Sequence, residues 1–202
     1  GSDHCPVGLI INMETKSKTM EVITYVPDRE TAIHELEIAG QMNPGPWTKH
    51  SYNVANAAEI IAEHSKGMSP DKAFVCGLLH DIGRRTGISA LRHNPFISVK
   101  DIEADIATKD VSKEQYDFIN NYLNHLEYDD YDKLIILCDA LADANGFCIL
   151  EKRFVDTTRR YGIYPFSVDR WNYTYQYKDY FERMAEKSIY KLLPDIEKSI
   201  YY

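Results

Sequence analysis

Hydrophobic residues recur at helical spacing along most of this chain from Asp28 onward. In each segment the apolar positions lie three or four residues apart, which is typical of helices that bury one face. Asp28 and Ser69 can each cap the start of a helix, and Gly162 can end one. We expect helices over residues 28–41, 46–65, 69–83, 112–127, 130–144, 147–161 and 167–186, then a last helix interrupted by Pro194. The pattern predicts an all-α fold of about seven or eight helices.

Two stretches lack this periodicity. The N-terminal stretch is the less regular, and residues 20–26 fit either a short strand or an extended arm. Residues 84–111 read as a loop. We divide the chain into an N-terminal arm over residues 1–27, a main domain over 28–165, and C-terminal helices over 166–202 that pack on that domain.

Composition and charge restrict the class of function. The net charge is −8, and a nucleic-acid polymer would require a basic surface, so we expect no such partner. No apolar run approaches the roughly 20 residues that span a bilayer, and no stretch reads as a signal peptide. Three of the four cysteines lie in apolar helical stretches, which is typical of small buried side chains in a reducing compartment. We expect a cytoplasmic protein, for which a homodimer is possible.

The apolar run over residues 74–83 contains a polar pair, His80 and Asp81. An ionised carboxylate buried there would be strongly unfavourable unless a partner compensated its charge. A divalent metal would compensate both side chains at once. The alternative is a solvated polar pair at the end of a helix, which the preceding leucines make less favourable.

Two further polar residues fall on apolar helix faces. His50 lies three residues after Trp47 and four before Val54, which places it on the buried stripe. Asp139 lies in a segment, residues 134–142, that is apolar on almost every face. Taken singly, such a histidine is more often a hydrogen-bonded core residue, and such an aspartate often pairs with an arginine or accepts a capping bond.

Together, His50, His80, Asp81 and Asp139 form an ordered set of candidate metal ligands on three expected helices. Mixed imidazole and carboxylate ligands suit Mn, Fe, Co, Ni or Zn better than Ca or Mg. Such a set would leave coordination positions open on a six-coordinate ion, which is a catalytic arrangement. We expect one or two such ions as cofactors.

The sequence resembles the HD-domain metal-dependent phosphohydrolase superfamily, of the HDIG type. The motif of that family is a histidine, a His-Asp pair and a downstream aspartate, and the matching positions are His50, His80-Asp81 and Asp139. The resemblance implies an HD-domain-like helical bundle with the main domain as its catalytic part. It also implies hydrolysis of a phosphomonoester or phosphodiester, of a nucleotide or similar small molecule, by metal-activated water. Asp81 would be catalytic, bridging or orienting that water.

A basic cluster follows the His-Asp pair. Arg84, Arg85 and Arg92 either hold a substrate phosphate through charge-assisted bonds or form a solvated loop. His93 is a candidate for phosphate contact or for a second metal, as in family members with two ions. His125 is badly placed as the further histidine that a second metal would need.

The segment between the His-Asp pair and the next expected helix is short for the family. Either the cover over the metal is trimmed in this protein, or residues are missing from the chain between about His93 and Ile97. Further along, Lys152, Arg153, Arg159 and Arg160 are expected to be solvated or to pair with carboxylates, and one of them could reach a substrate.

Two other functions remain open. An HD-type di-iron oxygenase would need more histidine ligands than the chain offers. A non-catalytic signalling module that binds a metal or a nucleotide needs only the ligand set, although such a sensor would be expected to carry a linked partner domain.

Overall fold

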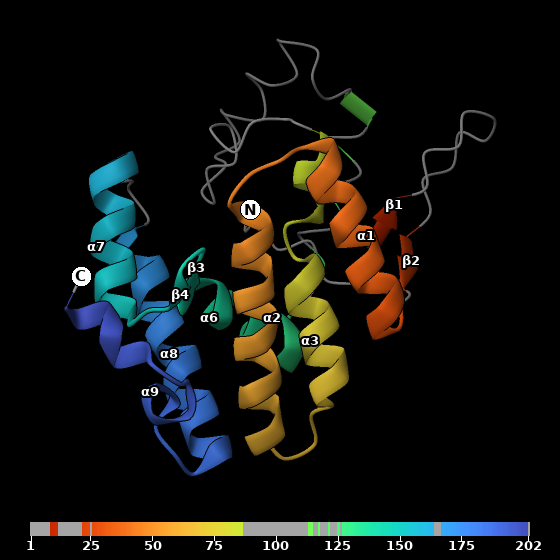
Figure 1. The fold of residues 1–202 in the computed structure, drawn as a ribbon. Helices are drawn as coiled ribbons and strands as arrows, with labels where there is room; N and C mark the ends of the chain where they lie inside the picture. The colour runs from red at the N-terminus through yellow and green to blue at the C-terminus, as the bar shows by residue number, and fades with distance from the viewer. Residues whose placement is uncertain are drawn as a thin grey trace.

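A computed structural model of the 202-residue chain describes residues 9–11, 22–24, 26–86, 113–114, 117, 121, 125, 127–163 and 167–201. Within these ranges it contains seven α-helices and two short antiparallel strand pairs (Figure 1). The predicted all-α class is therefore confirmed. None of the helices described is long and apolar enough to cross a membrane.

The first two helices, α1 (Arg29–Met42) and α2 (Trp47–His64), have nearly the predicted boundaries. The side chain of Asp28 accepts a hydrogen bond from the backbone N–H of Thr31, which is the predicted cap of α1.

The third helix, α3 (Pro70–Leu79), begins where predicted but ends before Gly83. Ser69 caps its first turn, as expected. A separate 3₁₀ helix, η1 (Ile82–Thr86), follows, so the first residues of the expected loop are in fact helical. The switch from α-helix to 3₁₀ helix occurs at the polar His-Asp pair, where the backbone N–H of Arg84 donates to the Asp81 carbonyl three residues earlier.

The helix α6 (Asp130–Ala140) is shorter than the predicted segment, which extended to Ala144. The chain instead turns through a tight hairpin formed by β3 (Ala142–Asp143) and β4 (Gly146–Phe147). The side chain of Asp143 accepts a hydrogen bond from the Asn145 N–H, and Gly146 has a positive φ of 143°. These Asp, Asn and Gly residues favour a turn, and that preference overrides the apolar run before it.

The C-terminal part is also helical. α7 (Leu150–Tyr161) begins after the hairpin, so the predicted start at residue 147 was wrong, but it ends at Gly162 as expected. α8 (Ser167–Ala185) is close to its prediction. Beyond it, α9 (Ile189–Leu192) and the 3₁₀ helix η2 (Ile196–Ile200) flank the proline that was expected to interrupt the last helix.

Near the N-terminus, β2 (Val22–Thr24) pairs with β1 (Leu9–Ile11). A strand over residues 20–26 was one of two predicted options, whereas its partner was not predicted. The predicted helix over 112–127 and the loop beyond residue 86 lie outside the continuously described residues.

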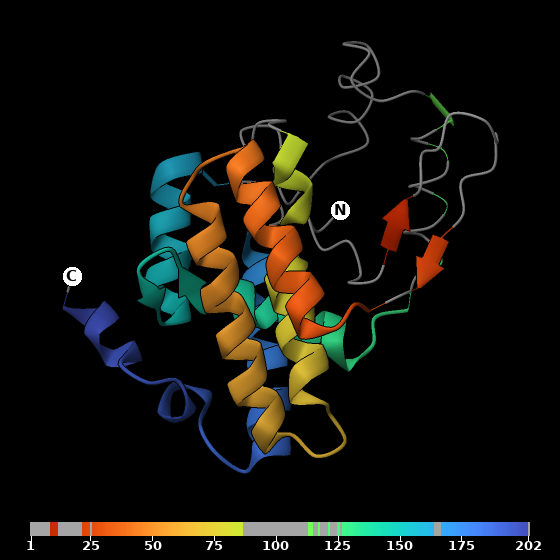
Figure 2. The same cartoon turned by 45° about the vertical axis from the view of Figure 1, so that its right-hand side comes forward.

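α2 is the central helix of the bundle. It contacts α3, α6 and α8, while α1 packs mainly on α3 (Figure 2). A larger core cluster joins α2, α6 and α8, and a smaller one lies among α1, α2 and α3.

Three cysteines, Cys76, Cys138 and Cys148, are free and buried within the larger cluster or against it. Burial raises the pKa of the Cys76 thiol to about 12. These three cysteines are small buried side chains, as predicted.

The contact between α2 and α3 depends on Gly77. A Cβ added there would lie 2.7 Å from the Ala55 Cα and 2.9 Å from the Ala55 nitrogen, both in the backbone of α2. A backbone atom cannot rotate away from such a contact, so α2 and α3 approach this closely only because residue 77 has no side chain.

We therefore expect Gly77→Ala to lower the free energy of unfolding. Overpacking of this kind costs about 1–3 kcal/mol, offset by up to about 1 kcal/mol from the better helix propensity of alanine. The melting temperature should fall by a few degrees. Gly83→Ala is the control, because a Cβ there meets nothing within 4 Å. Equal melting temperatures for the two variants would show that the close approach is not rigid.

Candidate metal centre

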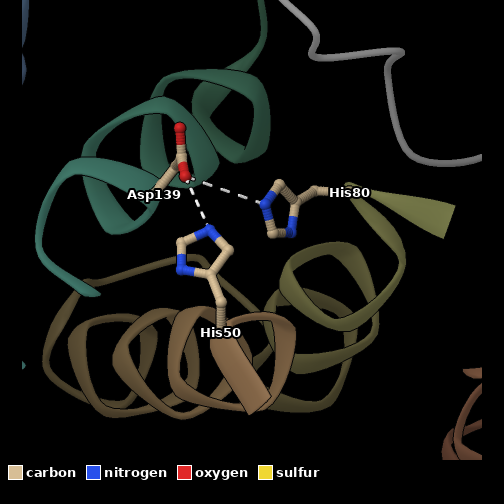
Figure 3. Close-up of side chains that lie close together, drawn as sticks. All are labelled: His50, His80 and Asp139. Carbon is tan, nitrogen blue, oxygen red and sulfur yellow. Dashed lines mark hydrogen bonds and ion pairs between the residues drawn. The ribbon is translucent and has the colours of Figure 1, made fainter. Parts of the chain in front are cut away.

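Three of the predicted ligands lie together where α2, α3 and α6 meet (Figure 3). His50 comes from α2, His80 is the residue that follows α3, and Asp139 lies in the last turn of α6. One potential ligand atom from each residue lies within 4.8 Å of the other two. Two imidazoles and a carboxylate at this spacing could hold a metal ion.

His80 is buried, with 6% of its surface exposed. Its Nδ1–H donates to the Gly77 carbonyl oxygen at 2.7 Å, so in the neutral imidazole its Nε2 presents a lone pair. That Nε2 makes no hydrogen bond within the described structure, and it lies 3.8 Å from both Asp139 Oδ1 and Asp81 Oδ2. A lone pair facing two carboxylate oxygens is repulsive unless a cation lies among them, so the donor set fits a metal ion.

His50 and Asp139 are joined directly. The His50 Nε2–H donates to Asp139 Oδ1 over 2.8 Å, and the His50 ring meets the His80 ring edge to face with centroids 5.2 Å apart. Burial raises the pKa of the Asp139 carboxyl. The hydrogen bond from His50, the two neighbouring imidazoles and the Arg153 guanidinium outweigh that effect and hold the pKa of this carboxyl well below its usual range. Asp139 is therefore ionised and available to a cation.

Two arginines approach the same carboxylate from other helices. Arg153 of α7 brings its Nη2 within 3.9 Å of Asp139 Oδ1, and Arg170 of α8 brings its Nη2 within 3.7 Å of Oδ2. Asp139 thus has two imidazoles and one guanidinium beside Oδ1 and the other guanidinium beside Oδ2.

Asp81 is buried next to this group but is not one of its three members. Its Oδ2 lies 2.6 Å from Arg84 Nε, in an ion pair that is not aligned as a hydrogen bond. The same oxygen is 3.8 Å from His80 Nε2. Asp81 therefore lies beside the candidate ligands, and its roles as ligand and catalytic residue remain predictions.

The side chains predicted to contact phosphate are not gathered around the candidate ligands as the predicted ligands are. Arg84 faces Asp81, and Arg85 lies on an exposed surface with its Nη1 3.6 Å from Glu35 Oε2. Arg92 and His93 lie outside the described residues. His125 is exposed and its Nδ1–H donates to the Asn121 carbonyl, one turn back in the chain.

Arg170 was missed by sequence reasoning, and Arg153 was considered only as one member of a basic run. A signal for Arg170 does exist. It lies three residues after Ser167 and four before Thr174, and both of these side chains are buried. An arginine on a buried helix face needs a carboxylate or another anion as partner.

Residues 29–116 match the family model of the HDOD domain. This part of the chain is similar to an HD-like helical domain. The match covers less than half of the chain and includes His50, His80 and Asp81, but it ends before Asp139. Searches of curated proteins and of solved structures gave no match to this chain.

Proposed function

We propose that this protein is a metal-dependent phosphohydrolase acting on a nucleotide or another small phosphorylated molecule. The observation that supports it best is the orientation of His80. Its Nδ1–H donates to the Gly77 carbonyl, and its buried Nε2, which makes no hydrogen bond within the described structure, lies 3.8 Å from two carboxylate oxygens. This is the way in which protein structures usually orient a metal-ligating histidine.

His50, His80 and Asp139 would hold a divalent transition metal, with Asp81 as a fourth ligand or as a neighbour. Such an ion lowers the pKa of bound water and polarises a phosphoryl oxygen. Asp81, held at Oδ2 by Arg84, would orient the attacking water. The water oxygen forms the new bond to phosphorus as the ester P–O bond breaks, and the proton released by the water ends on the leaving oxygen.

The first test is a metal count on protein purified without chelator and again after reconstitution. We expect close to one Mn, Fe, Co, Ni or Zn ion per chain, detected by elemental analysis. A panel of nucleotides and phosphoesters should then give phosphate release that depends on the ion. Protein that neither retains nor takes up any of these metals would exclude the proposed site.

A second candidate is a non-catalytic module that binds a ligand. Domains of the HDOD type are often non-catalytic signalling domains. The ion pair between Asp81 and Arg84 is consistent with this reading, because it engages the carboxylate proposed to orient water. Under this function the protein would bind a nucleotide or a metal without releasing phosphate from any compound in the panel.

A further inference from the structure

Among the described residues, two cationic side chains that approach Asp139 come from α7 and α8, outside the segment in which phosphate contacts were predicted. Arg153 and Arg170 are both partly exposed, with 24% and 26% of their side chains accessible. They therefore lie between the candidate ligands and solvent, on the side from which a substrate could approach.

Their positions are fixed by an aromatic contact. Phe154 of α7 stacks on Trp171 of α8, with ring centroids 5.4 Å apart and planes within 16° of parallel. Each arginine directly precedes one of these rings in the chain. The stacked pair ties the two helices together, so both guanidinium groups are held close to Asp139 before any ligand arrives.

The distances from the two arginines to Asp139 indicate that they have a role beyond pairing with this carboxylate. At 3.7 and 3.9 Å the nitrogen–oxygen distances exceed hydrogen-bond length, so the two arginines act on Asp139 through charge. A guanidinium carries five N–H donors in a planar fork that matches the oxygens of a phosphoryl group. Two such forks beside a metal ligand are suited to an anion that also touches the metal.

We propose that Arg153 and Arg170 form a clamp for the phosphoryl group of the substrate. This assignment rests on the proposed function, because it places the substrate phosphate next to the metal. It also moves phosphate binding away from Arg84 and Arg85, which face Asp81 and Glu35. The ligand is any small molecule with a terminal phosphoryl group, including inorganic phosphate.

The test measures phosphate and metal binding separately. Inorganic phosphate is titrated calorimetrically into Arg153→Gln and Arg170→Gln, with and without Mn²⁺. Arg160→Gln on α7 and Arg183→Gln on α8 are matched controls, since both side chains are exposed. We expect each clamp variant to weaken phosphate binding about tenfold and the controls to leave it unchanged.

Metal affinity separates the clamp from a purely structural role. Removing a positive charge beside Asp139 should leave Mn²⁺ affinity unchanged or increase it. The clamp is supported if phosphate affinity falls while Mn²⁺ affinity does not. Arginines that only neutralise Asp139 would alter the melting temperature but leave phosphate affinity at the wild-type value, and that result would overturn the proposal.

The two proposals can fail independently. If the wild-type protein binds no metal, yet its phosphate affinity depends on Arg153 and Arg170, the anion clamp stands and metal-dependent hydrolysis does not. If it binds Mn²⁺ but no phosphate under either condition, the clamp is excluded and the metal site stands. A nucleoside monophosphate that competes with inorganic phosphate would show that both occupy the clamp through the phosphoryl group they share.

Discussion

Replacing His80 with alanine is expected to reduce phosphate release by about a thousandfold, because loss of a metal ligand removes several kcal/mol of transition-state stabilisation. His80 is the candidate ligand whose orientation is set most clearly, through the Gly77 carbonyl. The measurement is phosphate release from the best compound of the panel, with saturating metal. Circular dichroism and a melting curve should accompany it, since the side chain is buried.

His64→Ala is the matched control for this experiment. His64 is the last residue of α2, and its Nδ1–H donates to a carbonyl one turn back, that of Ile60, but it is exposed and distant from the candidate ligands. Phosphate release should be unchanged in this variant. Wild-type rates in folded His80→Ala would contradict a mechanism that uses this site.

Adding a divalent transition metal should stabilise the folded protein, and Asp139→Asn should abolish the effect. A ligand that binds only the native state at a hundred times its Kd contributes about 2.7 kcal/mol. For a chain of this size that corresponds to a rise in melting temperature of about 5–10 °C. The measurement is a thermal melt with chelator and then with increasing metal.

Asp139→Asn keeps the shape of the side chain and an oxygen that can accept the hydrogen bond from His50, but it removes the negative charge. The metal-dependent rise should therefore disappear, even if the variant melts somewhat lower without metal. Asp156→Asn is the control, because Asp156 pairs with Lys152 and is not one of the candidate ligands. A metal-induced rise of equal size in Asp139→Asn would place the ion elsewhere in the protein.

Local signals were sufficient to predict much of the fold. Asp28 and Ser69 cap helices at the predicted positions because capping is decided by a few adjacent residues. The segment 130–144 was mispredicted for a related reason: the turn preferences of Asp143, Asn145 and Gly146 compete with an apolar run, and periodicity alone did not resolve that competition.

The candidate site was predictable where a ligand lies on an apolar stripe. His50, His80 and Asp139 interrupt buried patterns, so their inward orientation could be inferred from sequence. The approach of Arg153 and Arg170 depends on how α7 and α8 pack relative to α6. Such packing is set by contacts between segments distant in the chain, which helical periodicity does not encode.

Gly77 supports the candidate metal centre in two ways. Its carbonyl orients His80, and its lack of a Cβ allows α3 to pack closely against α2. The atoms that a larger residue would meet belong to the backbone of α2, so no exchange of an α2 side chain can make room for it. In genetic terms, a loss-of-function change at this position should be without suppressors on the facing helix. Reversion should restore glycine itself.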